Sequence, residues 1–288
     1  MRFAIFYQEF CIFQYFFVSL QRIIKIISIL STINMRFIGI IPARYASTRF
    51  PGKPLVDICG KTMIQRVYEQ AKKALDIVVV ATDDQRIYDT VKHFGGEVVM
   101  TRADHKCGTD RCLEAYQKVK AQLALSDQET VIINIQGDEP FIQPSQIDAI
   151  KSCFPTEIAT LVKPYTTEDS IEDLENPNTP KVVFSAVDHH AVLFSRSVIP
   201  YLRNIDKKEW LAQGKHYRHI GMYAYRADIL SQITQLPQSD MEKAESLEQL
   251  RWLENGYQIK VAVCETYSMG IDTPADLEQA IQYLKDKI

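Results

Sequence analysis

Residues 37–54 read FIGIIPARYASTRFPGKP, and this stretch decides how we interpret the rest of the chain. Its first residues, 37–41, are apolar and are bounded by turn formers, a pattern typical of a buried strand in a parallel sheet. Pro42 has no N–H to donate, so we expect it to end the hydrogen-bond ladder. The residues after it would then lie at the carboxyl end of a parallel strand, where open α/β sheets bind their ligands.

The loop after this strand combines three cationic side chains, Arg44, Arg49 and Lys53, with small residues such as Ala43 and Ser47. Arginine offers a planar fork to an anion, lysine a point charge, and small residues let backbone N–H groups approach a ligand closely. Together these groups have the chemistry of a polyphosphate cradle. Composition alone favours an ordinary solvated loop, so the order of the residues has to decide between the two interpretations.

Composition limits the classes of function. A chain of 288 residues, 46% of them hydrophobic, can bury one large α/β core or two small ones. Its net charge of −3 gives no basic field, so no nucleic-acid partner is expected. The six cysteines show no CxxC or Cys/His metal spacing, which predicts reduced thiols in a cytosolic protein.

Residues 1–34 differ in kind from the rest, because they are rich in Phe and Ile and carry a slight positive charge. Their longest uncharged run, 10–21, is shorter than the roughly 20 residues that span a bilayer, and no small-residue cleavage site is clear. We interpret residues 1–34 as an N-terminal extension outside the fold, with Met35 as the physiological start and no membrane partner. A peripheral membrane helix is the alternative.

Hydrophobic periodicity divides the remaining chain, 35–288, into two halves. Residues 35–155 alternate apolar runs with amphipathic segments, which predicts parallel strands joined by right-handed crossovers through helices. In residues 156–288 the pattern changes to strands that are close in sequence, with a hairpin over 181–195. One long helix is expected over 241–255.

Two aspartates stand at positions where a carboxylate can have a structural or a functional role. Asp138, in the run QGDEP, comes just after the β-branched stretch 130–135, where a carboxylate is well placed to bind a hard cation. Asp272 stands before Thr273 and Pro274, at the start of the last expected helix. Capping of a helix N-terminus is a sufficient explanation for either aspartate taken alone.

Other polar residues also have both a structural and a functional interpretation. The run 101–111, TRADHKCGTDR, is typical of a helix entry in which Thr109 caps the helix. In the run HYRHIGMYAYR, His219 and Tyr223 would ordinarily be a satisfied core imidazole and a half-buried strand aromatic. A cation such as Arg196 can equally bind a ligand carboxylate, and His219 and Tyr223 can hydrogen-bond ligand hydroxyls.

The order of these motifs closely resembles one family. Residues 37–54 are similar to the N-terminal signature of the CMP-Kdo synthetases, the 3-deoxy-manno-octulosonate cytidylyltransferases, and QGDEP, LEQLR and DTP follow in the family's order. The resemblance spans residues 35–288. It implies an α/β fold with a Rossmann-like, mixed but mostly parallel sheet of the nucleotide-diphospho-sugar transferase type. The nucleotide-binding half would be 35–155, and 156–288 would be the β-rich half for sugar binding and dimerisation.

The resemblance also implies an activity, the transfer of CMP from CTP to 3-deoxy-manno-octulosonate (Kdo) with release of diphosphate, in lipopolysaccharide biosynthesis. It implies Mg²⁺ as the cofactor and a cytoplasmic homodimer. The implied catalytic residues are Arg44, Lys53, Asp138 and Asp272, and the two aspartates would hold the metal. The implied nucleotide-binding residues are Ala43, Arg44, Ser47, Lys53, Arg102, Gly108, Arg111 and Gln136, and those for Kdo are Gln136, Arg196, His219, Gly221, Tyr223, Glu248 and Gln249.

Departures from the family and rival functions limit this identification. Cys107 and Asp110 stand where we expect Ser and Glu, so only three residues of the run 101–111 are carried over. A first rival function is CMP transfer to another acidic sugar, such as an 8-amino relative of Kdo or a nonulosonic acid, although YASTRFPGKP resembles those relatives less closely. A second is a catalytically silent nucleotide-binding protein, which the joint retention of all four catalytic residues argues against.

Overall fold

The computed structural model describes residues 35–46, 50–266 and 270–286. The chain divides into two units, Met1–Met35 and Arg36–Ile288, and the fold below is that of the second unit. The extension predicted for residues 1–34 lies outside the described residues. In the described part of the chain, no helix has the length and apolar character needed to cross a membrane.

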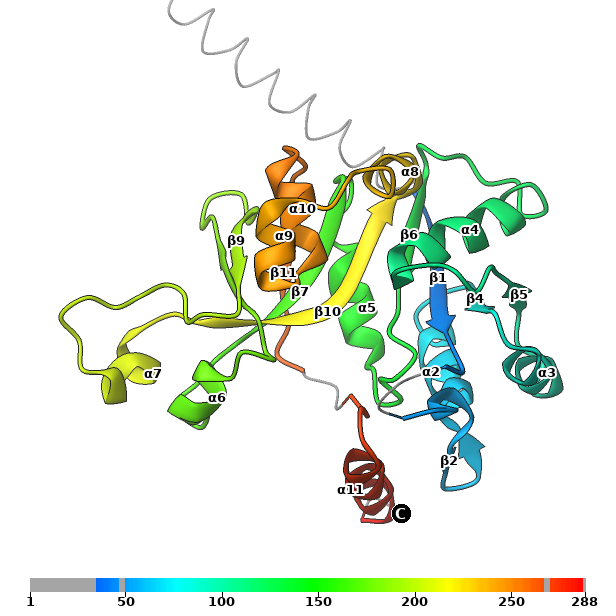
Figure 1. The fold of residues 1–288 in the computed structure, drawn as a ribbon, viewed down its shortest axis with the longest axis horizontal. Coiled ribbons are helices and arrows are strands. Elements are labelled where there is room, and N and C mark those ends of the chain that lie inside the picture. The colour runs from blue at the N-terminus through cyan, green and yellow to red at the C-terminus, as the bar shows by residue number, and fades with distance from the viewer. Residues whose placement is uncertain (1–34, 47–49, 267–269, 287–288) are drawn as a thin grey trace, which may run out of the picture. The chain divides into compact units, whose positions relative to one another are not determined.

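A mixed sheet of nine strands, counted within the described residues, forms the centre of this unit (Figure 1). The strands of the unit, including a separate two-stranded pair, are β1 (Arg36–Ala43), β2 (Asp57–Ile58), β3 (Lys61–Thr62), β4 (Ile77–Thr82), β5 (Val98–Met100), β6 (Thr130–Asn134), β7 (Ile158–Pro164), β8 (Lys181–Phe184), β9 (Ala191–Ser195), β10 (Tyr217–Arg226) and β11 (Ile259–Val263). Their order is β11-β7-β10-β6-β1-β4-β5, with β8 paired to β10 and β9 to β8. Along the main path, β10 alone is antiparallel to its neighbours, so the expected mostly parallel α/β sheet is confirmed.

Helices cover both faces of the sheet. They are α2 (Met63–Lys72), α3 (Gln85–His93), α4 (Gly108–Lys120), α5 (Pro144–Lys151), α6 (Ile171–Glu175), α7 (Trp210–Gln213), α8 (Ala227–Ile233), α9 (Asp240–Glu245), α10 (Glu248–Glu254) and α11 (Pro274–Lys285), with two 3-10 turns, η1 (Lys53–Leu55) and η2 (Lys207–Glu209). Ile38 and Ile40 of β1 share one core with α4, α8 and α10. Gly39 points to the opposite face, where an added Cβ would lie 2.8 Å from Leu75, just after α2. Both faces of β1 are therefore packed against other parts of the fold.

Strand β1 runs two residues further than the sequence predicts. We expected Pro42 to end the ladder, but both Pro42 and Ala43 pair with β4. On its other side, β1 pairs with β6 only as far as Ile40, whose carbonyl accepts the N–H of Ile135. Because backbone groups alternate sides along a strand, the nitrogen of Pro42 faces the side where β6 no longer pairs. The missing N–H therefore removes no ladder bond.

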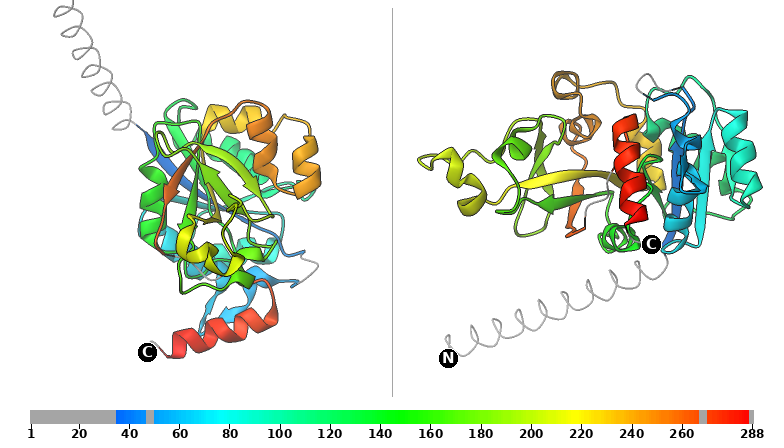
Figure 2. Two further views of the ribbon diagram at one scale, coloured as in Figure 1. Left: turned by 90° about the vertical axis from the view of Figure 1, so that its left-hand side faces the viewer. Right: turned by 90° about the horizontal axis from the view of Figure 1, so that it is seen from below.

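A β-rich arm, made of α6, β8, β9, α7 and the start of β10, extends from the sheet. The expected hairpin is confirmed, because β8 and β9 pair antiparallel. Figure 1 shows β9, α6 and α7 on the left, with the yellow strand β10 running from them into the sheet, and the right-hand view of Figure 2 shows the same course. β10 shifts register between Ile220 and Tyr223, so one strand serves both the arm and the main sheet.

The expected helix over 241–255 is wrong in one respect, because it is two helices. Helix α9 ends at Glu245, its C-cap Ser246 adopts the left-handed conformation with φ 50°, and α10 begins at Glu248. The break leaves the carbonyls of Glu245 and Ser246 outside a continuous helix, and both accept hydrogen bonds from Arg196 of the arm. A long-range contact therefore replaces the local hydrogen bonds that the sequence pattern favours.

Candidate active site

The ends of two central strands meet the start of α4. An added Cβ at Gly108, the first residue of α4, would lie 3.4 Å from Pro42 of β1 and 3.7 Å from the side chain of Asn134 of β6. Ala43, the last residue of β1, is buried, so only its backbone can face a ligand. The predicted nucleotide contact Ser47 lies outside the described residues, as does Arg49. Residues 44–46 and 50–52 of the loop after β1 are described, and they bring its two ends together.

Tyr45 and Gly52 make that closure. The N–H of Gly52 donates to the carbonyl of Tyr45 at 2.9 Å, and Gly52 adopts a left-handed φ of 71°. An added Cβ at Gly52 would also lie 3.1 Å from the Tyr45 ring, so glycine is required for two reasons. The guanidinium of Arg86, near the start of α3, lies 3.3 Å from the centroid of the same ring. The cations Arg44, which is exposed, and Lys53 directly flank the two residues of this closure.

Lys53 joins the two aspartates that the sequence singled out. Its Nζ lies 2.7 Å from Oδ2 of Asp138 and 3.1 Å from Oδ1 of Asp272. The two carboxylates are 134 residues apart in sequence (272 − 138), and the N–H of Ile271 donating to the carbonyl of Asp138 at 2.9 Å holds their segments together. The lysine side chain is 15% exposed, against 32% and 48% for the aspartates, so solvent reaches the carboxylates.

Neither aspartate caps a helix, which removes the structural alternative. The N-cap of α5 is Gln143, five residues after Asp138. The N-cap of α11 is Thr273, whose hydroxyl accepts the N–H of Asp276. The carboxylate of Asp276 in turn accepts the N–H groups of Asp272 and Thr273 at 2.9 and 2.8 Å. The N-cap role of α11 thus belongs to Thr273, and the side chain of Asp272 pairs with Lys53.

Two carboxylates that converge on one cation fit Mg²⁺. Mg²⁺ is usually held by one or two carboxylates together with substrate phosphates and water, rather than by a cage made only of protein groups. Within the described residues there is no group of three His, Cys, Asp or Glu side chains suited to a metal. If the pair Asp138 and Asp272 held Mg²⁺, phosphate oxygens and water would have to supply the other ligands.

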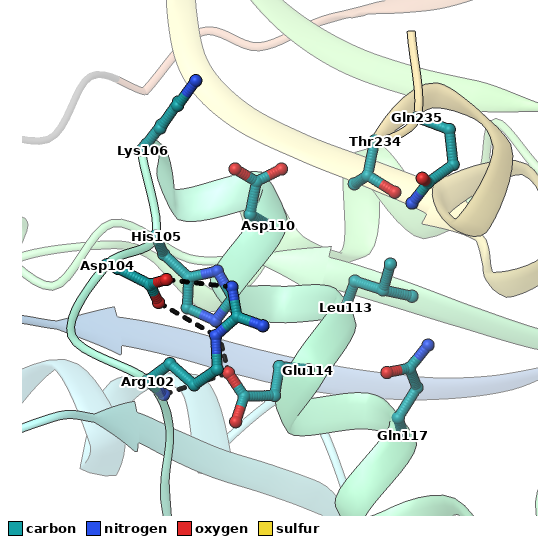
Figure 3. Close-up of a pocket in the computed structure, with 10 residues that line it drawn as sticks. All are labelled: Arg102, Asp104, His105, Lys106, Asp110, Leu113, Glu114, Gln117, Thr234 and Gln235. Carbon is teal, nitrogen blue, oxygen red and sulfur yellow. Dashed lines mark hydrogen bonds and ion pairs between the residues drawn. The ribbon is translucent and has the colours of Figure 1, made fainter.

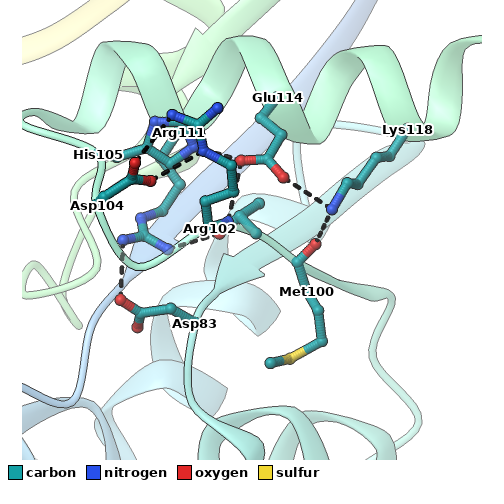
Figure 4. A network of polar contacts seen from close by, with 9 residues as sticks. Asp83, Met100, Arg102, Asp104, His105, Arg111, Glu114 and Lys118 are labelled. Atoms are coloured by element: carbon teal, nitrogen blue, oxygen red, sulfur yellow. Dashed lines mark hydrogen bonds and ion pairs between the residues drawn. The ribbon is translucent and has the colours of Figure 1, made fainter.

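The loop over 101–111 separates two arginines that the sequence grouped. Arg111 is buried and donates to Oγ1 of Thr101 at 2.5 Å and to Oδ2 of Asp83 at 3.1 Å, joining α4 to the end of β4 (Figure 4). Arg102 is 68% exposed and pairs with Asp104 at 2.9 Å. It lines a cavity of about 520 Å³ that is bounded on the far side by the end of α8 (Figure 3).

Strand β10 carries three of the predicted sugar contacts. Gly221 lies in its register shift, and the carbonyl of Gly221 accepts a hydrogen bond from the side chain of Gln136 at 2.9 Å. Tyr223 is 8% exposed, and its ring packs edge-on against Trp252 of α10. Because Gln136 stands only two residues before Asp138, this hydrogen bond connects the carboxylate cluster to β10.

His219 is a neutral hydrogen-bonding group. Removal from solvent lowers the pKa of its imidazole to about 3, because burial disfavours the charged form. Its Nε2 lies 2.9 Å from the hydroxyl of Thr160, and that hydroxyl donates to the carbonyl of Met222 at 2.9 Å. A hydroxyl that donates to Met222 can only accept from His219, so Nε2 carries the proton and Nδ1 is the acceptor nitrogen.

Arg196 is held by backbone carbonyls. Its guanidinium donates to the carbonyls of Glu245, Pro177 and Ser246 at 2.5, 2.7 and 3.2 Å. The backbone N–H of Arg196 donates to the carboxylate of Glu245 at 2.8 Å. The same carboxylate accepts a hydrogen bond from the hydroxyl of Ser195 at 2.6 Å. The cation is thereby fixed at the junction of the arm with α9 and α10.

Glu248 contacts α4 from the start of α10. Its carboxylate accepts hydrogen bonds from Thr109 at 2.9 Å and from the thiol of Cys107 at 3.3 Å, and burial raises the pKa of Glu248.

We expected Thr109 to cap α4, but Cys107 is the N-cap residue and makes no side-chain cap bond. Desolvation and the nearby Glu248 carboxylate raise the pKa of Cys107 to about 12, so its sulfur stays a thiol. Gln249, 4% exposed, follows Glu248.

The predicted residues thus form connected groups. Lys53, Asp138 and Asp272 share one cluster, which Gln136 links to β10, and Glu248 links α10 to the start of α4. The exposed Arg102 and the buried Arg111 pair with different acids and do not join this cluster. Sequence reasoning missed the roles of Thr109, Tyr45 and Arg86. The positive φ required at Gly52 was a signal for the closure at Tyr45, but nothing local pointed to the contacts of Thr109 or Arg86.

Comparison with known proteins identifies the family of this chain. The family model described as Cytidylyltransferase matches residues 38–260. A 3-deoxy-manno-octulosonate cytidylyltransferase of Parabacteroides distasonis is 60% identical over 257 residues, covering 88% of this chain and all of the relative. The enzyme of the same description from Bacteroides thetaiotaomicron is 58% identical over 256 residues, again covering 88% of this chain and all of the relative.

A solved structure is also similar over the same part of the chain. It is a CMP:2-keto-3-deoxy-manno-octonic acid synthetase complexed with CTP, which is 40% identical, covers 88% of this chain and all of its own, and superposes with a TM-score of 0.78. Its sequence identity is well above the level at which only a fold is shared. The chain therefore belongs to the cytidylyltransferase family, and within it to the 3-deoxy-manno-octulosonate cytidylyltransferases.

Proposed function

We propose that this chain activates Kdo with CTP, forming CMP-Kdo and diphosphate for lipopolysaccharide biosynthesis. The anomeric hydroxyl oxygen of Kdo forms a bond to the α-phosphorus of CTP, the bond from that phosphorus to the departing diphosphate breaks, and the hydroxyl proton passes to solvent. The observation that carries the proposal is the cluster of Lys53 with Asp138 and Asp272 beside the loop that follows β1. The similarity to CMP-Kdo synthetases over 88% of the chain supports the choice of substrates.

The nucleotide half would hold the triphosphate by charge. Arg44 is exposed at the end of β1, and Lys53 begins η1. The loop closed by Tyr45 and Gly52 therefore has the guanidinium of Arg44 on one side and the ammonium of Lys53 on the other. These cations would neutralise the phosphates, which otherwise repel a nucleophile, and would stabilise the diphosphate as it leaves.

The two aspartates would hold Mg²⁺ together with phosphate oxygens of CTP. The ion would supply charge neutralisation at the α-phosphate and acidify the attacking hydroxyl. The chain's own contribution is to fix the two carboxylates, Asp138 through the close packing of Gly137 on the carbonyl of Pro42 and Asp272 through the capping of α11 by Thr273.

The sugar half would recognise an acidic sugar. Arg196 donates three of its five N–H groups to carbonyls, which leaves two for the sugar carboxylate. His219 is neutral, so its Nδ1 would accept a hydrogen bond from a hydroxyl and would not compete with Arg196 for the carboxylate. The bonds to Thr109 and Cys107 would hold the carboxylate of Glu248 in one orientation toward the sugar.

We further propose a cytoplasmic homodimer. Three large apolar side chains of the arm region are exposed, Val187 at 96%, Val192 at 64% and Tyr201 at 74%, which supports burial against a second copy. The use of CTP and the free thiols of five described cysteines support the cytoplasm. Light scattering would test the dimer, because Val192→Lys should then dissociate it while the wild type stays dimeric.

Diphosphate release tests the proposed reaction. Residues 35–288 would be supplied with Mg²⁺ and each of CTP, UTP and ATP, with and without Kdo. Release that requires both CTP and Kdo is expected. Release with CTP and an 8-amino relative of Kdo or a nonulosonic acid, but not with Kdo, would keep the chemistry and overturn the substrate. No release with any pair would overturn the reaction.

A further inference from the structure

The ammonium of Lys53 occupies the point on which both aspartates converge. It lies 2.7 Å from Asp138 and 3.1 Å from Asp272, and its side chain is only 15% exposed. Both oxygens that contact it are the groups with which a divalent cation would be held. Two cations cannot share that point, because they repel each other and are bound by the same two carboxylates. Lys53 and a metal ion are therefore alternatives between these two carboxylates.

We propose that Lys53 is the resident counter-cation of the Asp138–Asp272 pair, and that metal and nucleotide bind as a unit because the triphosphate draws the Lys53 ammonium away. This inference rests on the proposed function, since it takes Asp138 and Asp272 as metal ligands and CTP as the nucleotide. It goes beyond that function by giving Lys53 a second task, which is to make the metal site weak until the nucleotide is present.

The local structure lets the ammonium move while its backbone stays fixed. The backbone around Lys53 is held by the bonds of the 3-10 turn, in which Leu55 donates to Gly52 and Val56 donates to Lys53, and Pro54 is buried. The lysine side chain, by contrast, has a flexible four-carbon stem and an ammonium that can exchange one anionic partner for another. A triphosphate beside Arg44 offers such a partner, whereas in the described part of the protein the ammonium forms ion pairs with the two aspartates.

The consequence is a coupling between two ligands. Without CTP, a metal ion has to displace an ammonium that then loses both carboxylates. With CTP, the ammonium gains phosphate oxygens and the ion gains phosphate ligands in addition to Asp138 and Asp272. Because coupling between binding sites is reciprocal, the metal should tighten nucleotide binding by the same factor by which the nucleotide tightens metal binding. Removing the ammonium should strengthen metal binding most where no nucleotide is present.

Binding of Mn²⁺, used as a paramagnetic probe, tests this without reference to turnover. Free Mn²⁺ would be measured by electron paramagnetic resonance for the wild type, Lys53→Met and the control Lys61→Met, whose exposed ammonium pairs with Glu69. Without nucleotide, Lys53→Met should bind Mn²⁺ at least tenfold more tightly than the wild type, and Lys61→Met should match the wild type. Circular dichroism at rising temperature would show that all three proteins fold.

A second arm separates this inference from the proposed metal site. With a non-hydrolysable CTP analogue present, and after subtraction of Mn²⁺ held by the analogue alone, the wild type should bind Mn²⁺ tightly and Asp138→Asn and Asp272→Asn should not. If those variants lose Mn²⁺ while Lys53→Met without nucleotide binds no more tightly than the wild type, the counter-cation role is overturned and the metal site stands. If Asp138→Asn and Asp272→Asn bind as the wild type does, both proposals are overturned.

Discussion

Replacing Gly137 by alanine should displace Asp138 without removing any functional group. Gly137 is not one of the glycines with a positive φ, so its backbone conformation suits alanine. An added Cβ, however, would lie 2.9 Å from the carbonyl oxygen of Pro42. Ordinary carbon-to-oxygen contacts are about 3.3–3.6 Å, so the loop has to move by about half an ångström. The Cβ is rigidly attached to the backbone and the oxygen of Pro42 is a backbone atom, so no flexible side chain can absorb the change.

The expected loss follows from that displacement. A misplacement of 1 Å at a catalytic group can cost about a hundredfold in rate, so half an ångström at Asp138 should lower kcat about tenfold. Overpacking of this kind should also lower the free energy of unfolding by about 1–3 kcal/mol. The rate would be measured as diphosphate release with saturating CTP and Kdo, at a temperature well below the unfolding midpoint of the variant.

Gly270→Ala is the matched control. Gly270 stands two residues before Asp272, and an added Cβ there would meet no atom of the described residues within 4 Å. This variant should keep the kcat of the wild type. The reasoning would be refuted if Gly137→Ala turned over as fast as the wild type, or if Gly270→Ala lost as much activity as Gly137→Ala.

Three further predictions concern the contacts around the cluster. Thr109→Val removes a hydroxyl that donates to Glu248, so we expect a several-fold higher KM for Kdo and an unchanged KM for CTP; equal rises in both would argue against it. Arg86→Ala removes the cation from the face of the Tyr45 ring and should raise the KM for CTP several-fold, with partial recovery in Arg86→Lys; an unchanged KM would show that the closure does not need it. The pKa of His219 is lowered to about 3 in the fold, so the unfolded chain binds more protons below about pH 6.5 and stability falls as pH falls. Urea unfolding should therefore give a loss of roughly 1 kcal/mol between pH 7.5 and 5.5 that His219→Gln lacks, and identical losses in both proteins would contradict it.

The sequence was sufficient for features that depend on neighbouring residues. The apolar run after Met35 predicted β1, and Thr273 before Pro274 predicted the start of α11, because strand burial and helix capping are local properties. The adjacency of Asp138 to the end of β6 was also readable, since the carboxyl ends of strands collect ligand-binding groups. The pairing of Asp138 with Asp272 came only from the family resemblance, because no local pattern relates residues so far apart.

The features that were missed all depend on contacts between distant segments. The run over 241–255 has a continuous helical pattern, and its break at Ser246 coincides with the guanidinium of Arg196, which donates to the carbonyls freed there. Pro42 lies inside β1 because β6 stops pairing beside it. The hydroxyl of Thr109 donates to Glu248 and does not cap α4, because α10 places Glu248 beside it. Each outcome is settled by packing in three dimensions, which propensity and periodicity do not record.

The most direct test of the account is CMP-Kdo formation by Asp138→Asn, Asp272→Asn and the double variant, with Asp286→Asn, at the exposed C-terminal end of α11, as the control. Groups that act as a unit give losses that do not add. We predict that each single variant loses at least about a thousandfold in kcat, that the double variant is little worse, and that the control is unchanged. A single variant that forms CMP-Kdo within tenfold of the wild-type rate, or losses that multiply in the double variant, would contradict a shared site.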